Sequence, residues 1–230
     1  MNIQTSSFIY QHMGLGDHLI CNGLIRKIIK AKTEYFMFVK PHNWGSISYM
    51  YRDIPNLKFI PCDDASAVSF INENNIGDRL HLIGFNWTDL TKSFEENFYL
   101  QHRVSFDEKW NSFRCDRDLK LEQKVYDHFN INEPYIFVHD DHRFRVNADR
   151  LPSDIRIIRA EQGITNSIFL YATLIENAKE VHCIESCFAF MVDLMKLNTE
   201  FFIHRYSRPL EGCDAVDLFG KYQNAKEILT

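Results

Sequence analysis

The chain has 230 residues, 45% of them hydrophobic and 14% aromatic, so it can bury a sizeable core as one domain or two small ones. Its net charge of −5 argues against a broad nucleic-acid surface, although local basic clusters remain compatible with phosphate binding. These properties favour a globular protein whose partner is a small molecule rather than a nucleic acid.

The six cysteines form no C-x-x-C pair, and several lie in apolar patterns where a reduced thiol acts as a small core residue. The chain shows no basic-then-apolar signal at its start, and no apolar run approaches the roughly 18 residues that span a bilayer. We therefore predict a cytoplasmic protein with at most peripheral membrane contact.

The segment 8–26 predicts a strand, a tight turn and a helix. An apolar run leads into Gly14 and Gly16, and apolar residues then recur at helical spacing: Ile20, Leu24, Ile25 and Ile28. Glycines accept positive φ and let a ligand approach the backbone, while a helix start presents unpaired N–H groups. An anion or a sugar hydroxyl is expected to bind at this turn.

Asp17 follows the two glycines and has two interpretations. It can be the N-cap of the helix or a general base at the mouth of the strand-to-helix turn. One residue can also fill both roles. The turn is a poor dinucleotide fingerprint, because Leu19 replaces the third glycine and Lys40 stands where an acid should follow the second strand. No Gly-Lys-Ser/Thr follows, which disfavours an ATP site.

Strands alternate with helices along the rest of the chain. Strands are predicted over 35–39, 57–61, 79–85, 135–139, 155–158, 181–184 and 201–204. This alternation predicts an α/β fold with two small Rossmann-like parallel-sheet domains facing across a cleft. We assign residues 1–115 to the first domain, 116–133 to a helical linker and 134–230 to the second domain. The segment 87–118 is expected to bridge the two halves, and the tail 219–229 to form a helix.

Polar residues follow two strands of the second half. The strand 135–139 ends at His139 and runs into Asp141, Arg143 and Arg145, where the carboxyl ends of open α/β sheets bind ligands. The strand 181–184 runs into a second strand-to-helix turn, and Ser186 stands at its expected cap. Both places are candidate ligand sites.

Two motifs resemble a known family. Residues 14–18 with the following helix, and residues 175–186 in the second half, resemble bacterial heptosyltransferase-like glycosyltransferases of the GT-B fold, including short members from surface-polysaccharide gene clusters. The resemblance implies that a sugar moves from a nucleotide-sugar donor to a hydroxyl of a saccharide or lipid-linked acceptor. It implies no cofactor besides the donor.

The resemblance also assigns roles to residues. Asp17 matches the position thought to deprotonate the acceptor hydroxyl, and Glu185 with Ser186 matches the turn near the donor phosphates. Cys187 and Phe188 stand where the family has glycine and histidine. Inverting transfer without a metal needs cations or helix N-termini to stabilise the departing diphosphate. Candidates for these cations are three arginines, whose guanidinium suits phosphate oxygens: Arg143, Arg145 and Arg208.

Other candidate sites carry weaker patterns. Residues 116–118 have a D-x-D form but precede a helix, which favours capping, and no well-spaced ligand set predicts a metal. His18 and His139 lie at strand ends and are possible acids, bases or hydrogen-bond donors. Cys187 at a helix start would have a lowered pKa, but nothing else indicates a thiol mechanism.

The sequence therefore predicts a metal-independent glycosyltransferase with Asp17 as base and a donor site in its second half. The alternative is a non-catalytic nucleotide- or carbohydrate-binding protein on the same scaffold, since a fold does not determine function. The donor nucleotide, the sugar, the acceptor, the stereochemistry and the oligomeric state all stay open.

Overall fold

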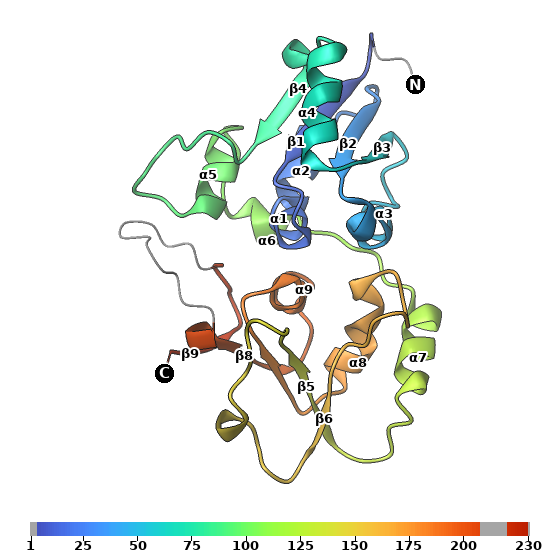
Figure 1. Ribbon diagram of the computed structural model, residues 1–230, viewed down its shortest axis with the longest axis vertical. Coiled ribbons are helices and arrows are strands. Elements are labelled where there is room, and N and C mark those ends of the chain that lie inside the picture. The colour runs from blue at the N-terminus through green and yellow to red at the C-terminus, as the bar shows by residue number, and fades with distance from the viewer. Residues whose placement is uncertain (1–3, 208–219, 230) are drawn as a thin grey trace. The chain divides into compact units, whose positions relative to one another are not determined.

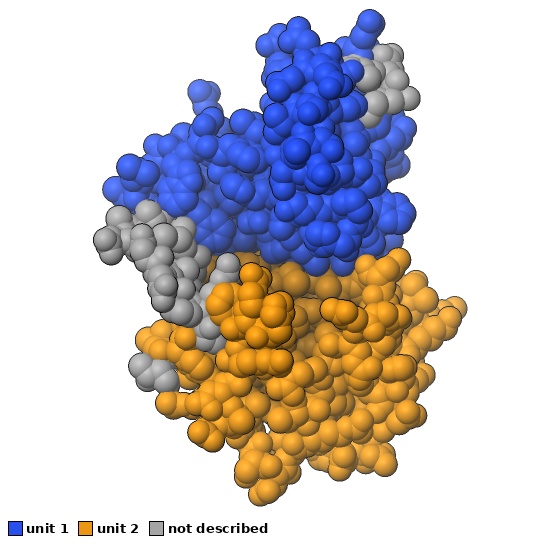
Figure 2. Space-filling view, viewed as in Figure 1, with its two compact units in different colours: residues 1–116, 215–217 blue, residues 117–214, 218–230 orange. Residues whose placement is uncertain are grey.

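The protein was analysed as a computed structural model, which describes residues 4–207 and 220–229. The described residues form two compact units that divide between Asp116 and Arg117 (Figure 2). Each unit contains one sheet with parallel strands throughout, so the predicted α/β fold with two parallel sheets is confirmed (Figure 1).

Unit 1 has a four-stranded sheet in the order β3-β2-β1-β4. Its strands are β1 (Ser7–Gln11), β2 (Tyr35–Val39), β3 (Leu57–Pro61) and β4 (Leu80–Ile83). Its helices are α1 (Leu15–Ile20), α2 (Asn22–Ile28), α3 (Trp44–Met50), α4 (Asp64–Glu73), α5 (Phe94–Leu100) and α6 (Glu108–Asn111), with short 3₁₀ turns at η1 (Pro41–Asn43) and η2 (Gly77–Arg79). The central strands are apolar on both faces, as expected for a covered parallel sheet.

The core of unit 1 and its caps follow local sequence signals. Phe8, Phe36 and Phe38 stack on one face of the sheet, and α4 covers them through Phe70. Asp63 caps α4 by accepting a hydrogen bond from the backbone N–H of Ser66 at 2.8 Å. The predicted first helix is in fact two helices, because the chain turns at Cys21.

Residues 94–111, the helical part of the segment 87–118 that the sequence analysis expects to bridge the two halves, pack on α1 and α2 and belong to unit 1. Tyr99 donates a hydrogen bond to the carbonyl of Ile20 at 2.7 Å. Lys109 and Glu95 form a fully buried ion pair, with 2.6 Å between Nζ and Oε2. These aromatic and charged residues do not recur at helical spacing, because their partners are not neighbours in the same helix. Tyr99 binds a residue about 80 positions earlier, and Lys109 in α6 pairs with Glu95 in α5.

Unit 2 has a five-stranded sheet in the order β6-β5-β7-β8-β9. Its strands are β5 (Tyr135–His139), β6 (Arg156–Ile158), β7 (Glu180–Cys183), β8 (Glu200–His204) and β9 (Lys226–Ile228). Its helices are α7 (Leu119–His128), α8 (Ala172–Glu176) and α9 (Cys187–Leu194), with 3₁₀ turns at η3 (Ala148–Arg150), η4 (Ile168–Tyr171) and η5 (Arg205–Ser207).

The C-terminal tail of unit 2 differs from the sequence expectation. Its described part contains β9 rather than a helix, and β9 pairs with β8. Lys226 also pairs with Glu200 across the two strands. The backbone of β8 offers this short polar segment a ladder of hydrogen bonds, which outweighs its weak local preference.

The helix α7, which the sequence analysis places in a linker, packs on α8 within unit 2. Arg117 fastens the two helices by pairing with Glu122 at 2.5 Å and with Glu176 at 2.6 Å. Asp118 caps α7 through the N–H groups of Lys120 and Leu121, as the capping interpretation of residues 116–118 predicts.

Replacing Gly23 by alanine is expected to destabilise unit 1. An added Cβ would lie only 1.9 Å from the backbone oxygen of Glu108, so α6 would have to move away from α2. Overpacking of this kind costs about 1–3 kcal/mol in the free energy of unfolding. Urea unfolding of Gly23→Ala measures the loss.

The matched control is Gly77→Ala, because nothing lies within 4 Å of a Cβ added at that exposed glycine. This control should unfold within about 0.5 kcal/mol of the parent. Equal stability of the two variants would show that α2 and α6 do not need the close approach at Gly23.

Candidate functional site

Each sheet has one topological switch point, the place where successive connections leave in opposite directions. In unit 1 it lies between β1 and β4, and in unit 2 between β5 and β7. Ligands of open α/β sheets bind outside the carboxyl ends of the strands at such points. Both predicted strand-to-helix turns, at Gly14 and at Ser186, follow strands that border a switch point.

The turn after β1 places Asp17 in the first turn of α1. Gly14, and not Asp17, is the N-cap residue, so the N-cap interpretation of Asp17 is wrong. Asp17 is the third residue of the helix, and a Cβ added at Gly14 would lie 2.5 Å from its Oδ2 atom. The missing side chain of Gly14 is therefore what gives the Asp17 carboxylate its position. Asn43 holds the turn by donating to the carbonyl of Met13 at 3.0 Å.

An aromatic stack lies beside this turn at the end of β4. The His12 ring packs on Phe85 with 4.7 Å between centroids, and its Nε2 lies 3.0 Å from the carbonyl oxygen of Gly84. Gly84 has φ +90, and a Cβ there would meet His12 and Phe98 at 2.5 and 2.7 Å. Phe85 remains 40% exposed, which leaves an aromatic surface of the kind that packs against sugar rings.

His18 is not available at this turn. Its side chain is fully buried, and its Nδ1 atom pairs with the Gln11 amide at 2.5 Å. Burial lowers the pKa of His18 to about 3, so the ring is neutral in the folded chain. Because neighbours on a helix point in different directions, Asp17 faces the turn while His18 faces the core.

The loop after β5 carries Arg143 and Arg145 and has a fixed backbone. Asp141 Oδ1 accepts the N–H groups of Arg143 and Phe144 at 2.7 and 2.8 Å, which forms an Asx turn. Burial raises the pKa of Asp141, but these two N–H groups outweigh it and hold the pKa below its usual value. Asp140 Oδ2 accepts the N–H of Val146 at 3.3 Å.

Asp140 anchors the charges of this loop. Its side chain is only 1% exposed and pairs with Arg159 at 3.0 Å and with Arg145 at 3.5 Å. Arg145 nevertheless keeps 63% of its side-chain surface exposed, and Arg143 is also exposed. Two guanidinium groups therefore remain accessible on a pre-organised loop, an arrangement suited to an anionic ligand.

The carboxyl ends of β5 and β7 each present one polar atom that lacks a partner among the described residues. Ser186 is the N-cap residue of α9, as predicted, but its hydroxyl caps no N–H group. Within the described residues, the buried Ser186 Oγ and His139 Nδ1 atoms have no hydrogen-bond partner. The His139 ring stacks on Phe188 at 4.3 Å, and burial lowers its pKa to about 4. Unpaired buried polar atoms each cost about 1–3 kcal/mol, which a ligand bound here would recover.

Glu185 and Cys187 do not fit the roles considered for them. Glu185 is buried, forms an ion pair with Arg205 and accepts a hydrogen bond from Tyr222 at 2.8 Å, so its carboxylate is engaged within unit 2. Arg205 also pairs with Glu227 at 2.6 Å. Burial raises the pKa of Cys187 to about 11, so the lowered pKa expected at the helix start is wrong.

Sequence reasoning missed two residues outside the loop 140–147 that hold it in place. Arg159 pairs with Asp140, and Tyr206 accepts the backbone N–H of Asn147. Both residues lie at least twelve positions from the loop in the chain. No local pattern indicates either of them. Arg208, the third predicted cation, lies outside the described residues.

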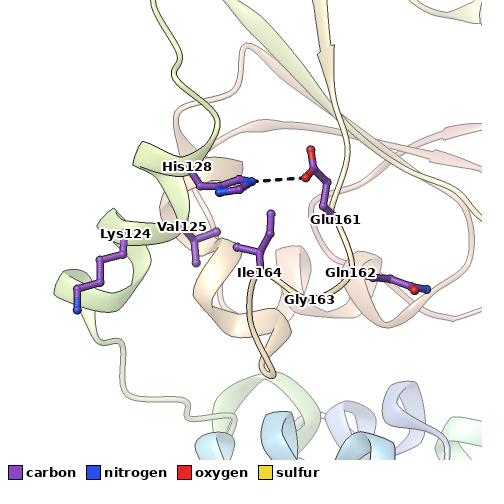
Figure 3. Close-up of a pocket in the computed structure, with 7 residues that line it drawn as sticks. All are labelled: Lys124, Val125, His128, Glu161, Gln162, Gly163 and Ile164. Atoms are coloured by element: carbon purple, nitrogen blue, oxygen red, sulfur yellow. Dashed lines mark ion pairs between the residues drawn. The ribbon is translucent and has the colours of Figure 1, made fainter.

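A separate cavity of about 530 Å³ lies between α7 and the loop 161–164 (Figure 3). His128 and Glu161 pair across it at 3.5 Å, and both side chains are more than half exposed. Its lining mixes charges of both signs, so it does not select an anion or a cation.

Among residues 4–207 and 220–229, no group of three or more metal-ligating side chains gathers in one place. The five cysteines in this part of the chain are free thiols. None of the described helices combines the length and apolar character needed to cross a membrane.

Comparison with known proteins identifies the fold. No family model and no curated protein matches the chain. The glycosyl transferase family 9 protein from Veillonella parvula DSM 2008 aligns with a TM-score of 0.60 at 10% identity, over 97% of this chain and 87% of that one. The iron-containing dodecameric glycosyltransferase TibC from enterotoxigenic E. coli H10407 aligns with a TM-score of 0.53 at 14% identity, over 87% of this chain and 58% of that one. The resemblance drawn from the sequence motifs is thus confirmed as a likeness of fold.

Lowering the pH from 6.5 to 5 is expected to destabilise the protein. Burial lowers the pKa of His18 to about 3. Burial is also the largest cause of the lowered pKa values of His139 and His204, which are both about 4. Histidine in the unfolded chain titrates near pH 6.5, so in this window the unfolded chain binds more protons than the folded chain. The free energy of unfolding therefore decreases as the pH decreases. The slope is up to about 1.4 kcal/mol per pH unit for each such histidine.

Urea unfolding at four pH values across this window measures the slope. The variant His42→Gln changes an exposed histidine and should leave the slope unchanged. A stability that is constant or rises as the pH falls would contradict neutral buried histidines.

Proposed function

We propose that the protein is a glycosyltransferase that moves a sugar from a nucleotide-sugar donor to a hydroxyl group of a saccharide or lipid-linked acceptor. The observation that supports this most is the loop 140–147 of unit 2. It presents two accessible guanidinium groups after β5, the strand that pairs with β7, whose following turn carries the buried Ser186 hydroxyl that has no partner among the described residues. The fold shared with glycosyl transferase family 9 is consistent with the proposal.

In this proposal unit 2 binds the donor. Arg143 and Arg145 pair with the diphosphate oxygens, and the first turn of α9 adds N–H donors and the favourable end of the helix dipole. Ser186 Oγ donates to a phosphate oxygen, which gives it the partner that it lacks. Glu185 stabilises the turn through Arg205 rather than contacting the donor.

Unit 1 binds the acceptor and supplies the base. The Asp17 carboxylate takes the proton of the acceptor hydroxyl as its oxygen forms a bond to the anomeric carbon of the donor sugar. The bond from that carbon to the diphosphate breaks, and the negative charge that develops on the leaving oxygen is stabilised by the arginines. Phe85 and His12 provide an aromatic surface for a sugar ring of the acceptor.

This assignment needs no metal to neutralise the diphosphate, and metal independence is part of the proposal. A hexose or heptose donor and a role in surface-polysaccharide synthesis follow from the sequence resemblance alone. Both are part of the proposal.

A second candidate is a nucleotide- or carbohydrate-binding protein without turnover. The engagement of Glu185 by Arg205 and Tyr222 favours it, because one acidic residue that the resemblance places at the donor is unavailable. The two candidates differ in whether Asp17 matters for anything besides binding.

Donor binding is tested by thermal-shift screening of UDP-, GDP-, ADP-, CMP- and dTDP-sugars, since a ligand of the native state raises its stability. We expect one nucleotide class to raise the melting temperature. Arg143→Ala or Arg145→Ala should weaken its binding on the order of 10- to 100-fold, the loss of one charge-assisted hydrogen bond.

Lys179→Ala is the matched control, because Lys179 is an exposed cation at the opposite, amino end of β7. It should bind the donor as the parent does. Absence of a shift with every donor, or equal weakening by Lys179→Ala, would contradict the donor site.

Asp17→Asn is expected to lower kcat about 10²- to 10⁴-fold while leaving donor binding unchanged, because the amide cannot accept the proton. A transfer assay with the donor identified above gives kcat, and calorimetry gives the dissociation constant. Asp78→Asn, at an exposed carboxylate of unit 1, serves as the control. Full transfer by Asp17→Asn would remove Asp17 as the base, and no transfer by the parent would favour the binding protein.

A further inference from the structure

A chain of hydrogen bonds runs through unit 2 from the start of β7 to the loop after β5. Glu180 Oε2 lies 2.9 Å from His182 Nε2, and His182 Nδ1 lies 3.0 Å from His204 Nε2. His204 Nδ1 lies 2.9 Å from the Tyr206 hydroxyl, which accepts the backbone N–H of Asn147 at 2.9 Å. His182 and His204 are 2% and 0% exposed, so this chain is shielded from water along its middle.

One arrangement of protons satisfies every link. The Glu180 carboxylate only accepts, so His182 carries its proton on Nε2 and accepts at Nδ1. His204 then carries its proton on Nε2, and its Nδ1 accepts the hydroxyl proton of Tyr206. The Tyr206 oxygen is left to accept the N–H of Asn147, as its geometry requires. Both histidines are neutral in this arrangement.

We infer that His182, His204 and Tyr206 are positioning residues that hold the 140–147 loop, and with it Arg143 and Arg145, in its binding conformation. The other backbone N–H groups bound in this loop have partners within it: those of Arg143 and Phe144 bind Asp141, that of Val146 binds Asp140, and that of Asp141 binds the carbonyl of Phe144. Tyr206 lies in η5 instead and links the loop through His204 to β8, a different strand of the sheet. The inference rests on the proposed function only where it treats the loop as a donor site.

The charges around the two histidines make this link sensitive to acid. Glu180 and Glu200 favour a charge on His182, whereas burial, the largest effect, lowers its pKa. Burial, His182 and Arg150 lower the pKa of His204 to about 4, and Phe202 stacks on the His182 ring. A proton added to the pair forces His204 to donate to Tyr206, so the Tyr206 oxygen then accepts from both His204 and the Asn147 N–H while its own proton loses its acceptor. This competition should weaken the bond to the loop as the pH falls towards 4.

Amide hydrogen exchange of the full chain tests the inference without any ligand. In Tyr206→Phe the peptide covering 141–147 should exchange about three- to tenfold faster than in the parent, the effect of losing one hydrogen bond. Tyr171→Phe is a matched control, because the Tyr171 hydroxyl holds both backbone groups of Glu161 at 3.1 and 2.9 Å in another loop. It should speed exchange around 161 and not at 141–147. Unchanged exchange at 141–147 in Tyr206→Phe would overturn the inference.

Two substitutions at His204 separate the hydrogen-bond chain from simple packing. His204→Gln keeps a donor and an acceptor but cannot be charged, so it should preserve slow exchange at pH 7 and abolish the acceleration that the parent shows near pH 4, after correction for intrinsic rates. His204→Leu keeps bulk without polar atoms and should exchange fast at both pH values. Equal behaviour of the two variants would overturn the positioning role.

Binding of inorganic pyrophosphate, measured by calorimetry, separates this inference from the proposed function. Weaker binding in Tyr206→Phe by the same three- to tenfold factor would support both. If the parent does not bind pyrophosphate but exchange accelerates as expected, the loop is positioned by Tyr206 and the donor site is wrong. If exchange accelerates and binding is unchanged, the positioning of Arg143 and Arg145 for an anion is overturned.

Discussion

Parallel pairing of the strands is the constraint from which the candidate sites of this protein arise. A parallel strand has to be reached by a crossover, so the carboxyl ends of all strands in a unit meet at one edge of the sheet. In each unit the chain first adds strands on one side of its first strand and then crosses to the other side. The polar turns after β1 and β7 therefore border the two places where no crossover covers the edge.

The two units place different kinds of side chain at these strand ends. Unit 1 offers one carboxylate, Asp17, a glycine turn and the aromatic rings of His12 and Phe85, which together suit a neutral polyhydroxyl ligand. Unit 2 offers guanidinium groups and unpaired polar atoms, which suit an anion. The proposed transfer needs both kinds of site, one for an acceptor hydroxyl and one for a departing diphosphate, and we assign them to unit 1 and unit 2 respectively.

A buried charge, Asp140, organises the candidate anion-binding loop 140–147 in the absence of a ligand. Asp140 is withdrawn from water, and Arg159, Arg145 and the Val146 N–H compensate for the lost hydration. Asp141 and Tyr206 bind further N–H groups of the same loop, so little backbone entropy remains to be lost on binding. The Arg145 side chain stays exposed while the N–H groups on either side of it, at Phe144 and Val146, are bound, which combines access with pre-organisation.

The sequence by itself determined the features that depend on neighbours along the chain. Strands β2, β3 and β5 begin and end where their apolar runs do, and the caps at Asp63 and Asp118 follow from local hydrogen bonding. Only the tertiary structure decided which polar groups are consumed and which are left available. The partners of Glu185 and Asp140 are Arg205 in η5 and Arg159 after β6, and His18 pairs with Gln11 at the end of β1 inside the core, so the burial and pairing of these groups depend on packing and not on spacing. The polar strand β9 exists for the same reason, because β8 supplies the hydrogen bonds that its own sequence does not predict.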